Sequence, residues 1–471
     1  MTPSTQQSEV ILSINPANGQ VAGQVEKNSE RQVERAIDLA NQAHIEGTWR
    51  KMLPHERAAT MRRIAAYLLE DKERLALLQM RENGKPILEC LRIVDNAANA
   101  WVYYAAVLET LETEVTPPRG NYLSHTILEP FGIVAAITPW NSPLMIESYK
   151  IAPALAAGNC VLLKPSEETP QTSLELLKFA KLAGLPDHTL QVIQGTGAEV
   201  GPKLINDDRV QMITFTGGTA TGRTIAKAAA ERLVPCTLEL GGKSPQIVFA
   251  DADLDLAVDG VVKGICGAAG QSCTAGSRLL IESRIYDDFL GKLKYEMSLV
   301  RVGAPHLETT QMGPLASFKH RDRVAALVDL AREEGATVEL GGFSPQGELS
   351  SGAYYAPTLL TGLSNNSRTW NEEIFGPVLC VRSFDDIEDL MRDANCGSYG
   401  LAAGIWTREF QKAWDVGRAI DAGTIWINTY EQSSLSTPFG GFKQSGIGRE
   451  KAAQCLRTYS QIKSFYWGMN T

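Results

Sequence analysis

One cysteine of the chain stands among residues so small that a substrate could approach its thiol closely. Cys273 lies within the stretch 266–276, CGAAGQSCTAG, and an apolar run at 279–281 follows it. A thiolate is the strongest nucleophile among the unmodified side chains and forms covalent intermediates with carbonyl compounds. Most unpaired cysteines are instead small buried apolar residues, and this stretch alone favours that interpretation. The rest of the chain decides between the two.

Two polar side chains elsewhere have the chemistry that a covalent site needs. Asn141 follows a predicted strand at 131–138, and its amide can donate hydrogen bonds to a developing oxyanion. Glu239 stands near the end of an apolar strand predicted at 236–240, where partial burial would raise its pKa toward the range of a general base. Each residue taken alone would fit an ordinary turn or an exposed strand end.

Further motifs suit a nucleotide. Lys164 and Glu167 follow a strand predicted at 160–163 and can bind the two hydroxyls of a ribose; a glutamate there favours NAD because it repels a 2′-phosphate. The stretch 215–222, FTGGTATG, runs from a strand into a helix, where glycines expose backbone amides to phosphate. It is not a GxGxxG motif, and the partial glycine pattern at 195–201 is equally weak alone.

The elements predicted around these motifs bring them to one place. Strands alternate with helices from 131 to 240, which is typical of a parallel sheet covered by helices on both faces. Ligand sites in such sheets lie at the carboxyl ends of the strands. A second α/β set is predicted over 245–430. The first 115 residues are predicted to be mostly helical, after a turn at 15–19.

Composition narrows the class of protein. The 471 residues carry a net charge of −9, which argues against a nucleic-acid or anionic-membrane surface. The eight cysteines are scattered without metal-ligand spacing, so neither a disulfide framework nor a metal site is expected. The N-terminus has no leader pattern, and no apolar run approaches the length of a membrane helix. We therefore expect a soluble, cytoplasmic protein without nucleic-acid or membrane partners.

Taken together, these stretches resemble the aldehyde dehydrogenase superfamily. Cys273 follows Glu239 by 34 residues, and the motifs EEIFGP at 372–377 and PFGGFK at 438–443 complete a pattern that covers nearly the whole chain in the family's order. The resemblance implies an α/β fold with a Rossmann-type cofactor domain, an α/β catalytic domain and a small β oligomerisation element. The boundaries that it implies are 1–115 and 131–240 for the NAD-binding domain, 241–445 for the catalytic domain, and 116–130 and 456–471 for the oligomerisation element.

The resemblance also implies roles for individual residues. Cys273 matches the nucleophile, Glu239 the base that activates water, Asn141 the oxyanion donor, and Lys150 and Glu450 a proton relay. Matches to the NAD site (with NADP possible) are Ile137, Thr138, Pro139, Trp140, Lys164, Ser166, Glu167, Gly197, Gly201, Phe215, Thr216, Gly217, Gly218, Thr221, Leu240, Gly241, Glu373 and Phe375. Matches to the substrate tunnel are Ser142, Ile146, Tyr149, Ser272, Thr274, Ser433 and Phe439.

The implied reaction oxidises an aldehyde to its acid through a thiohemiacetal and a thioester on Cys273, which water hydrolyses. A dehydrogenase that transfers the acyl group to coenzyme A is an alternative, but the presence of Glu239 argues against it. A catalytically silent NAD-binding member is another, and the intact site residues argue against that. A cysteine hydrolase of another fold would need a histidine partner, and none of the six histidines falls in these motifs.

The sequence alone does not decide cofactor affinity, substrate charge or oligomeric state. Gly218 replaces a serine that many members have, which puts cofactor affinity in doubt. The tunnel positions are mostly small or polar, so we expect a roomy, wet tunnel. Glu147 and Glu431 would favour a hydroxylated or cationic aldehyde if they face it, and no arginine stands out as a carboxylate clamp. The resemblance implies a homodimer or homotetramer without deciding between them.

Overall fold

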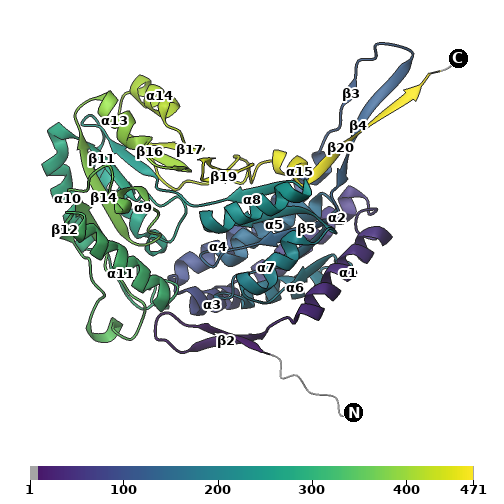
Figure 1. Cartoon of the computed structure of the whole chain (residues 1–471), viewed down its shortest axis with the longest axis horizontal. Helices are drawn as coiled ribbons and strands as arrows, with labels where there is room; N and C mark the ends of the chain where they lie inside the picture. The colour runs from purple at the N-terminus through teal and green to yellow at the C-terminus, as the bar shows by residue number, and fades with distance from the viewer. Residues whose placement is uncertain (1–8, 470–471) are drawn as a thin grey trace.

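The computed structural model describes residues 9–469. Two stretches lie outside this range. Residues 1–8 include most of the N-terminus whose sequence shows no leader pattern, and residues 470–471 belong to the predicted oligomerisation element. Figure 1 shows two lobes side by side, with a narrow β arm projecting from one of them.

The first lobe is built on a six-stranded sheet. Strands β5, β6, β7, β8 and β9 are parallel, as the sequence predicts, and the short β19 joins the edge antiparallel to β9. Both faces are covered: Val134 and Ala136 of β5 pack with one group of helices, and Ile133 and Ala135 with the other. The order across the sheet is β19 (Gly446–Ile447), β9 (Cys236–Glu239), β8 (Val210–Thr216), β5 (Ile133–Ile137), β6 (Cys160–Lys164) and β7 (Leu190–Val192).

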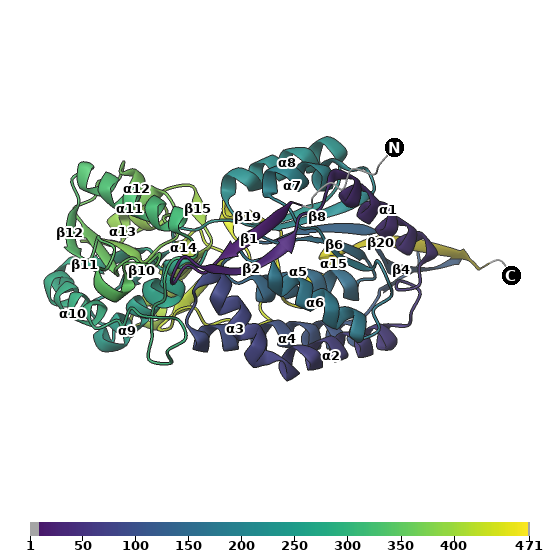
Figure 2. The ribbon, with the colours of Figure 1, turned by 90° about the horizontal axis from the view of Figure 1, so that it is seen from below.

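The helices of this lobe divide between the two faces. One group comprises α2 (Pro54–Glu70), α3 (Lys72–Asn83), α4 (Ile87–Thr110), α5 (Pro143–Ala156) and α6 (Gln171–Leu182). The other comprises α1 (Glu30–Glu46), α7 (Gly197–Asn206) and α8 (Thr219–Arg232). Figure 2 shows the two groups on opposite sides of the strands.

The second lobe is built on a seven-stranded sheet, parallel except for its edge strand β12. Its order is β12 (Thr337–Leu340), β13 (Thr358–Thr361), β14 (Val378–Phe384), β11 (Arg278–Glu282), β10 (Pro245–Val248), β16 (Ala402–Trp406) and β17 (Thr424–Ile427). The helices that surround it are α9 (Leu254–Cys266), α10 (Tyr286–Ser298), α11 (Phe318–Glu333), α12 (Arg368–Asn371), α13 (Ile387–Ala394) and α14 (Phe410–Ala419).

The arm joins two segments that are far apart in the sequence. Strand β4 (Tyr122–Pro130) pairs antiparallel with β20 (Ser460–Gly468) along its whole length, and the short β3 (Val115–Thr116) pairs with its other edge. The helix α15 (Gln454–Thr458) leads the chain into β20. The two segments predicted to form the oligomerisation element therefore contribute strands to one ribbon, which Figure 1 shows pointing away from the lobes.

Several short strands were not predicted. The turn at 15–19 connects a hairpin of β1 (Val10–Ile14) and β2 (Val21–Glu26), whose residues are mostly exposed and so lack the alternating apolar pattern of a half-buried strand. Its turn reaches the second lobe, where the Ala353 N–H donates to the Pro16 carbonyl at 2.7 Å. The two-residue pair β15 (Tyr399–Gly400) and β18 (Phe442–Lys443) was also missed.

Between residues 9 and 469, no helix combines the length and the apolar character that a membrane crossing requires.

A buried arginine holds the connection between the lobes in place. The Arg278 guanidinium donates to the Lys243 carbonyl at 2.8 Å, to the Asp393 carbonyl at 2.7 Å and to the Ala394 carbonyl at 2.9 Å. Arg278 begins β11, and Lys243 belongs to the segment that leaves β9 of the first sheet. Three buried carbonyls thus depend on one side chain for their hydrogen bonds.

We expect Arg278→Met to lower the free energy of unfolding by about 3 kcal/mol, since each buried carbonyl left unpaired costs about 1–3 kcal/mol. Thermal melting of the two proteins measures the change. Arg284→Met is the matched control, because that side chain is 66% exposed and lies on the surface of the same lobe. Equal melting temperatures for the two variants would show that the Arg278 bonds contribute nothing.

Candidate active site

Strand register aligns the predicted motifs of the first lobe along one edge of its sheet. Ile137 at the end of β5 pairs with Lys164 of β6 on one side and with Phe215 of β8 on the other. Thr216 of β8 pairs in turn with Glu239 of β9. Because these strands are parallel, all their carboxyl ends meet at this edge, as the sequence predicts.

The second lobe presents the opposite end of its strands to this edge. Cys273 precedes β11 and Glu373 precedes β14, so both lie at amino ends of the second sheet. Gly242, in the segment between the lobes, touches both: a Cβ there would lie 2.3 Å from the Cys273 carbonyl, and its N–H donates to the Glu373 carboxylate at 2.9 Å. The site therefore lies between the two sheets.

Cys273 is held as a thiol in the resting protein. Its side chain is half-buried, and burial raises the pKa of the thiol to about 12. The carboxylates of Glu373 and Glu239 raise this pKa further, whereas the ammonium of Lys451 lowers it. The loop before it places Ala268 at φ 51° and Ala269 at φ 53°, a left-handed conformation costly for alanine and typical of functional sites.

Glu239 is a buried carboxylate without a protein partner. Neither of its oxygens has a hydrogen-bond donor within residues 9–469, and a Cβ on Gly440 would lie 2.8 Å from one of them. Burial raises the pKa of Glu239 well above its usual value; the charge of Glu450 raises it further, and that of Lys150 opposes the rise. Such a group can take up a proton near neutral pH, and its free lone pairs suit a water molecule.

Asn141 lies directly against the cysteine loop. Its Nδ2 donates to the carbonyl of Gln271 at 3.0 Å. An amide nitrogen carries two protons, so one remains for another acceptor. Gln271 is itself fixed, because its Oε1 accepts from the Ala316 N–H at 2.8 Å.

Lys150 and Glu450 form a buried ion pair. The Lys150 ammonium donates to the Glu450 carboxylate, and also to the Thr214 hydroxyl at 3.1 Å. The two residues are 300 positions apart in the chain, yet the fold brings them together as the relay hypothesis requires. Their charges act on Glu239, as the shifts in its pKa show.

The predicted nucleotide residues lie along one edge of the first sheet. The Lys164 ammonium donates to Glu167 at 2.8 Å, and the N–H of Gly197 helps to lower the pKa of that glutamate. Thr138 and Thr216 each carry a buried hydroxyl without a protein partner among the residues described. These unpaired groups fit a polar ligand at the strand ends.

Glycines at the start of α8 leave room for that ligand. A Cβ on Gly217 would lie 2.5 Å from the Phe215 ring, so a side chain there would force the ring to move. A Cβ on Gly218, which caps α8, would meet no atom within 4 Å. The departure from serine at position 218 thus leaves open space at the helix N-terminus, where phosphate binds favourably.

Aromatic rings and smaller residues complete the predicted nucleotide set. The Trp140 ring lies 5.3 Å from Phe375 and 5.2 Å from His320, measured between centroids. His320 was not predicted; its Nε2 lies 2.7 Å from the Phe375 carbonyl, and burial lowers its pKa to about 4. The other predicted residues lie in helices or directly after strands of the first lobe. Gly201 is inside α7 and Thr221 in the first turn of α8; Pro139 follows β5, Ser166 follows β6, and Leu240 and Gly241 follow β9.

The predicted tunnel residues come from three parts of the chain. Ser142, Ile146 and Tyr149 share one face at the start of α5, by their spacing of four and three. Ser272 and Thr274 flank the nucleophile, with their hydroxyl oxygens 3.0 Å apart. The remaining two predicted residues, Ser433 and Phe439, belong to the C-terminal segment, and both lie next to Lys451.

Lys451 is the principal site residue that the sequence analysis missed. Its ammonium donates to the Ser433 hydroxyl at 2.6 Å and lies 5.1 Å from the Tyr149 ring centroid and 4.9 Å from that of Phe439. Three predicted tunnel residues thus surround one cation. Its place directly after Glu450 was the signal that could have revealed it.

The two glutamates considered for the tunnel have different positions. Glu147 does not face it: the carboxylate is fully buried and accepts from the Ser173 hydroxyl at 2.6 Å, toward α6. Glu431 belongs to the site, since its charge acts on Cys273. Its side chain remains accessible to solvent, yet desolvation by the groups around it raises its pKa to about 7.

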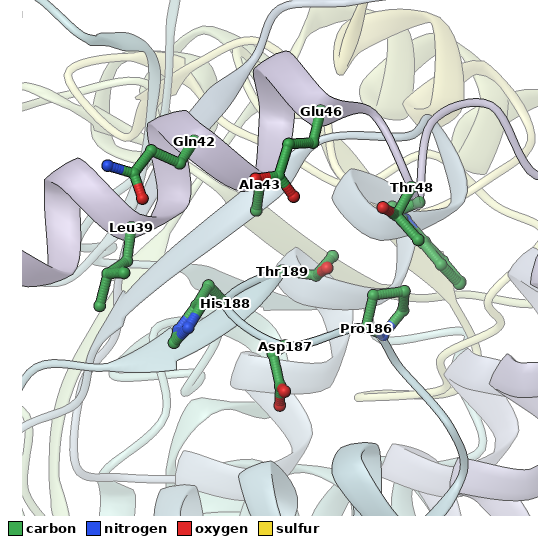
Figure 3. Close-up of a pocket in the computed structure, with 10 residues that line it drawn as sticks. Leu39, Gln42, Ala43, Glu46, Thr48, Pro186, Asp187, His188 and Thr189 are labelled. Carbon is green, nitrogen blue, oxygen red and sulfur yellow. The ribbon is translucent and has the colours of Figure 1, made fainter.

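A second hollow lies away from these residues. It measures about 430 Å³ and runs between α1 and the loop 186–189. Figure 3 shows Gln42 and Glu46 of the helix facing Asp187 and His188 of the loop. This loop enters β7 at its amino end, so the hollow is at the edge of the sheet opposite to the predicted nucleotide residues.

Comparison with known proteins identifies the family. The model of the aldehyde dehydrogenase family matches residues 2–465. A betaine aldehyde dehydrogenase of Bacillus subtilis (strain 168) is 38% identical over 465 residues, covering 98% of this chain and 95% of that protein. The chain therefore belongs to the aldehyde dehydrogenase family. The predicted family and enzyme class, an oxidoreductase acting on aldehydes, are confirmed.

Solved structures agree with this assignment. The betaine aldehyde dehydrogenase of Staphylococcus aureus in complex with NAD+ superposes with a TM-score of 0.96 at 36% identity, covering 98% of this chain and 92% of that one. The NAD+ complex of an aldehyde dehydrogenase from Bacillus cereus gives 0.95 at 37% identity, covering 98% and 94%. The predicted fold class is thereby confirmed.

The thiol of Cys273 should have an unusually high pKa. We expect its rate of alkylation by iodoacetamide, without cofactor, to rise about tenfold per pH unit from pH 7 to 9, because only the thiolate reacts and a pKa near 12 keeps its fraction small. Mass spectrometry of the Cys273 peptide follows the reaction, with glutathione as a reference thiol. A rate that is flat across this range would mean that the thiolate is already formed.

Proposed function

We propose that this chain oxidises an aldehyde to the free carboxylic acid with NAD, through a covalent intermediate on Cys273 that water hydrolyses. The observation that carries the proposal is the Glu239 carboxylate, which is buried, has no protein partner within the residues described and acts electrostatically on Cys273. A group of this kind serves as the base for a hydrolytic water.

The residues at the first sheet fit the cofactor. Lys164 and Glu167 would hold the adenosine ribose, Gly217 and Gly218 would leave room for the pyrophosphate, and Glu373 would bind the nicotinamide ribose. The nicotinamide, when bound, supplies the hydride acceptor that converts the adduct on Cys273 into a thioester. Glu167 favours NAD over NADP, because a carboxylate repels a 2′-phosphate. NADP remains possible as a second cofactor.

Attack on the aldehyde requires that Cys273 lose its proton. With a thiol pKa near 12, the proton needs an acceptor, and Glu239 has the raised pKa of a suitable one. The second proton on Asn141 Nδ2 and the backbone N–H of Cys273 would donate to the oxyanion of the adduct. Asn141 is already seated on the cysteine loop, so little reorganisation is required.

Hydrolysis of the thioester uses the same glutamate in its second role. Before this step Glu239 must give up the proton that it took from the Cys273 thiol. It would then take a proton from water as the oxygen attacks the acyl carbon, and return that proton to the Cys273 sulfur as the carbon–sulfur bond breaks and the free acid leaves. The first proton needs a path outward. The Lys150–Glu450 pair is buried beside Glu239 and can serve as the next carrier.

The buried Glu239 argues against both alternatives, the acylating dehydrogenase and the catalytically silent member. An enzyme that transfers the acyl group to coenzyme A needs no base for water, whereas here a buried carboxylate is maintained without a partner at a cost in stability. A silent family member would need neither this carboxylate nor the reactive cysteine near it. Hydrolytic aldehyde oxidation accounts for both groups.

We also propose the domain division and the assembly implied by the sequence. The five parallel strands of the first sheet with their helices (1–115 and 131–240) would be the NAD-binding domain, and the seven-stranded sheet with its helices (241–445) the catalytic domain. The arm (116–130 and 456–471) would be the oligomerisation element. Eight unpaired cysteines support a reducing, cytoplasmic location.

The arm has the surface of an interface. Its β20 strand leaves Ile462 66% and Tyr466 71% exposed, and Val115 of β3 is 68% exposed. A projecting ribbon with large apolar side chains and an open edge strand is unfavourable in water and is stabilised by pairing with another copy. We propose a homodimer or homotetramer formed through it.

The variant Glu239→Gln tests the hydrolytic role. It should form about one NADH per active site, more slowly than the wild type because glutamine cannot take the thiol proton, and then stall. Steady-state turnover should fall about 10²- to 10⁴-fold, because glutamine keeps the size of the side chain and removes the base for water. Rapid mixing with aldehyde and NAD, followed by intact mass, should reveal an acyl adduct on Cys273.

Cys273→Ala provides the control for this experiment and should give neither burst nor adduct. Full turnover of Glu239→Gln without an adduct would mean that another group activates the water. Restored turnover on addition of coenzyme A, with an acyl-thiol product, would place the protein in the acylating class.

For the assembly, we expect the double variant Ile462→Asp/Tyr466→Asp to form a smaller species than the wild type, whose mass should be a multiple of 51.3 kDa. Two charges on the apolar face oppose its burial. Light scattering after gel filtration measures the mass. Tyr295→Asp/Leu299→Asp, which changes exposed apolar residues of the second lobe, should leave it unchanged. Identical masses for all three proteins would exclude the arm as the interface.

A further inference from the structure

Lys451 places an ammonium group among the residues predicted to line the substrate tunnel. Its backbone lies at φ 59° and that of Ala452 at φ 53°, a strained conformation for both. Backbone hydrogen bonds hold the segment there: the Phe439 N–H donates to the Glu450 carbonyl at 2.8 Å, and the Ala452 N–H donates to the Leu435 carbonyl at 2.6 Å. The fold therefore fixes the backbone of Lys451 beside the predicted tunnel residues.

The ammonium has spare hydrogen-bonding capacity and no ion-pair partner. One N–H donates to the Ser433 hydroxyl, which leaves two others. No carboxylate between residues 9 and 469 lies within 4.0 Å of it, and its neighbour Glu450 is already paired with Lys150. The side chain is half-buried, and a cation removed from water in this way is stabilised by an anion.

The aromatic rings of the tunnel are already engaged by this cation. Tyr149 and Phe439 lie with their centroids about 5 Å from the Lys451 ammonium, the distance at which ring faces attract a positive charge. A pair of rings in that arrangement would otherwise suit a quaternary ammonium group. A cationic aldehyde would meet the lysine charge instead.

We propose that Lys451 determines the substrate class by binding an anionic group of the aldehyde, so that the enzyme prefers aldehydes bearing a carboxylate and disfavours cationic ones. This inference rests on the proposed function, since it concerns the aldehyde that the same site oxidises. It revises the expectation from the sequence, which sought an arginine for this task and found none.

Other charged groups face the same space. Burial lowers the pKa of the Lys451 ammonium, and the charges of Glu450 and Glu239 oppose that shift. Burial raises the pKa of Glu431 to about 7, so this opposing charge is partly lost at neutral pH; the Lys85 ammonium opposes the rise and the Glu89 carboxylate adds to it. The ammonium is thus the group of this set best placed to recognise a free anion.

The test compares aldehydes that match in length and differ in charge. Succinic semialdehyde carries a carboxylate and butanal is its neutral four-carbon counterpart, while betaine aldehyde carries a cation. In Lys451→Met the ratio of kcat/KM for succinic semialdehyde to that for butanal should fall about 10- to 100-fold, as expected for loss of a hydrogen bond to a charged group. The ratio of betaine aldehyde to butanal should rise.

Two further variants separate charge from structure. Lys451→Arg keeps the cation and should retain most of the preference for succinic semialdehyde over butanal. Lys263→Met removes a lysine whose side chain is 75% exposed on α9 and should leave both ratios unchanged.

A measurement without cofactor checks binding alone. Succinate should slow the alkylation of Cys273 by iodoacetamide in the wild type and have a much smaller effect in Lys451→Met, whereas butyramide should act equally on both.

The outcomes distinguish this inference from the proposed function. Wild-type oxidation of butanal with NAD, combined with ratios that do not differ between wild type and Lys451→Met, would overturn the role of Lys451 and leave aldehyde oxidation intact. A wild type that oxidises none of the three aldehydes would overturn both.

Discussion

The burial of charge between two sheets is the constraint on which this structure depends. Glu239 sits in a medium of low dielectric without a protein donor, and the nearest compensation is an ion pair, Lys150–Glu450, that is itself buried. A carboxylate in such surroundings is destabilised as an anion, and this is the property that makes it a base near neutral pH. The same surroundings keep Cys273 protonated, so the chemistry of each group requires the other.

Two parallel sheets create this environment by the way they face each other. The first presents the carboxyl ends of its strands and the second presents amino ends, and the short segment 240–244 crosses between them. Because Gly242 touches the cysteine loop and Arg278 binds the Lys243 carbonyl, the positions of Glu239 and Cys273 are linked through the backbone as well as through charge. Motion of one lobe relative to the other would change both at once.

The sequence predicted those parts of the molecule that rest on local signals. Strand β5 is a continuous apolar run and β8 is largely apolar; the turns that follow them carry Asn141 and the glycines before α8, so both fold and motif were visible. The hairpin β1–β2 was missed because its residues are mostly exposed. The direction of Glu147 and the place of His320 depend on contacts with distant segments, which no local pattern encodes. Lys451 stood beside a recognised motif, but only the fold shows that three tunnel residues surround it.

Similarity of the whole chain and identity of the substrate are separate questions here. The relatives named above share the fold almost completely, with TM-scores of 0.95 and 0.96, yet about two thirds of their residues differ from this chain. Specificity is a difference between affinities, and one charge in a partly desolvated tunnel changes it far more than many substitutions on the surface. A cation held beside Tyr149 and Phe439 would favour anionic aldehydes without moving a strand. The substrate class therefore follows from the side chains at the tunnel, while the reaction class follows from the two sheets that hold Cys273 and Glu239 together.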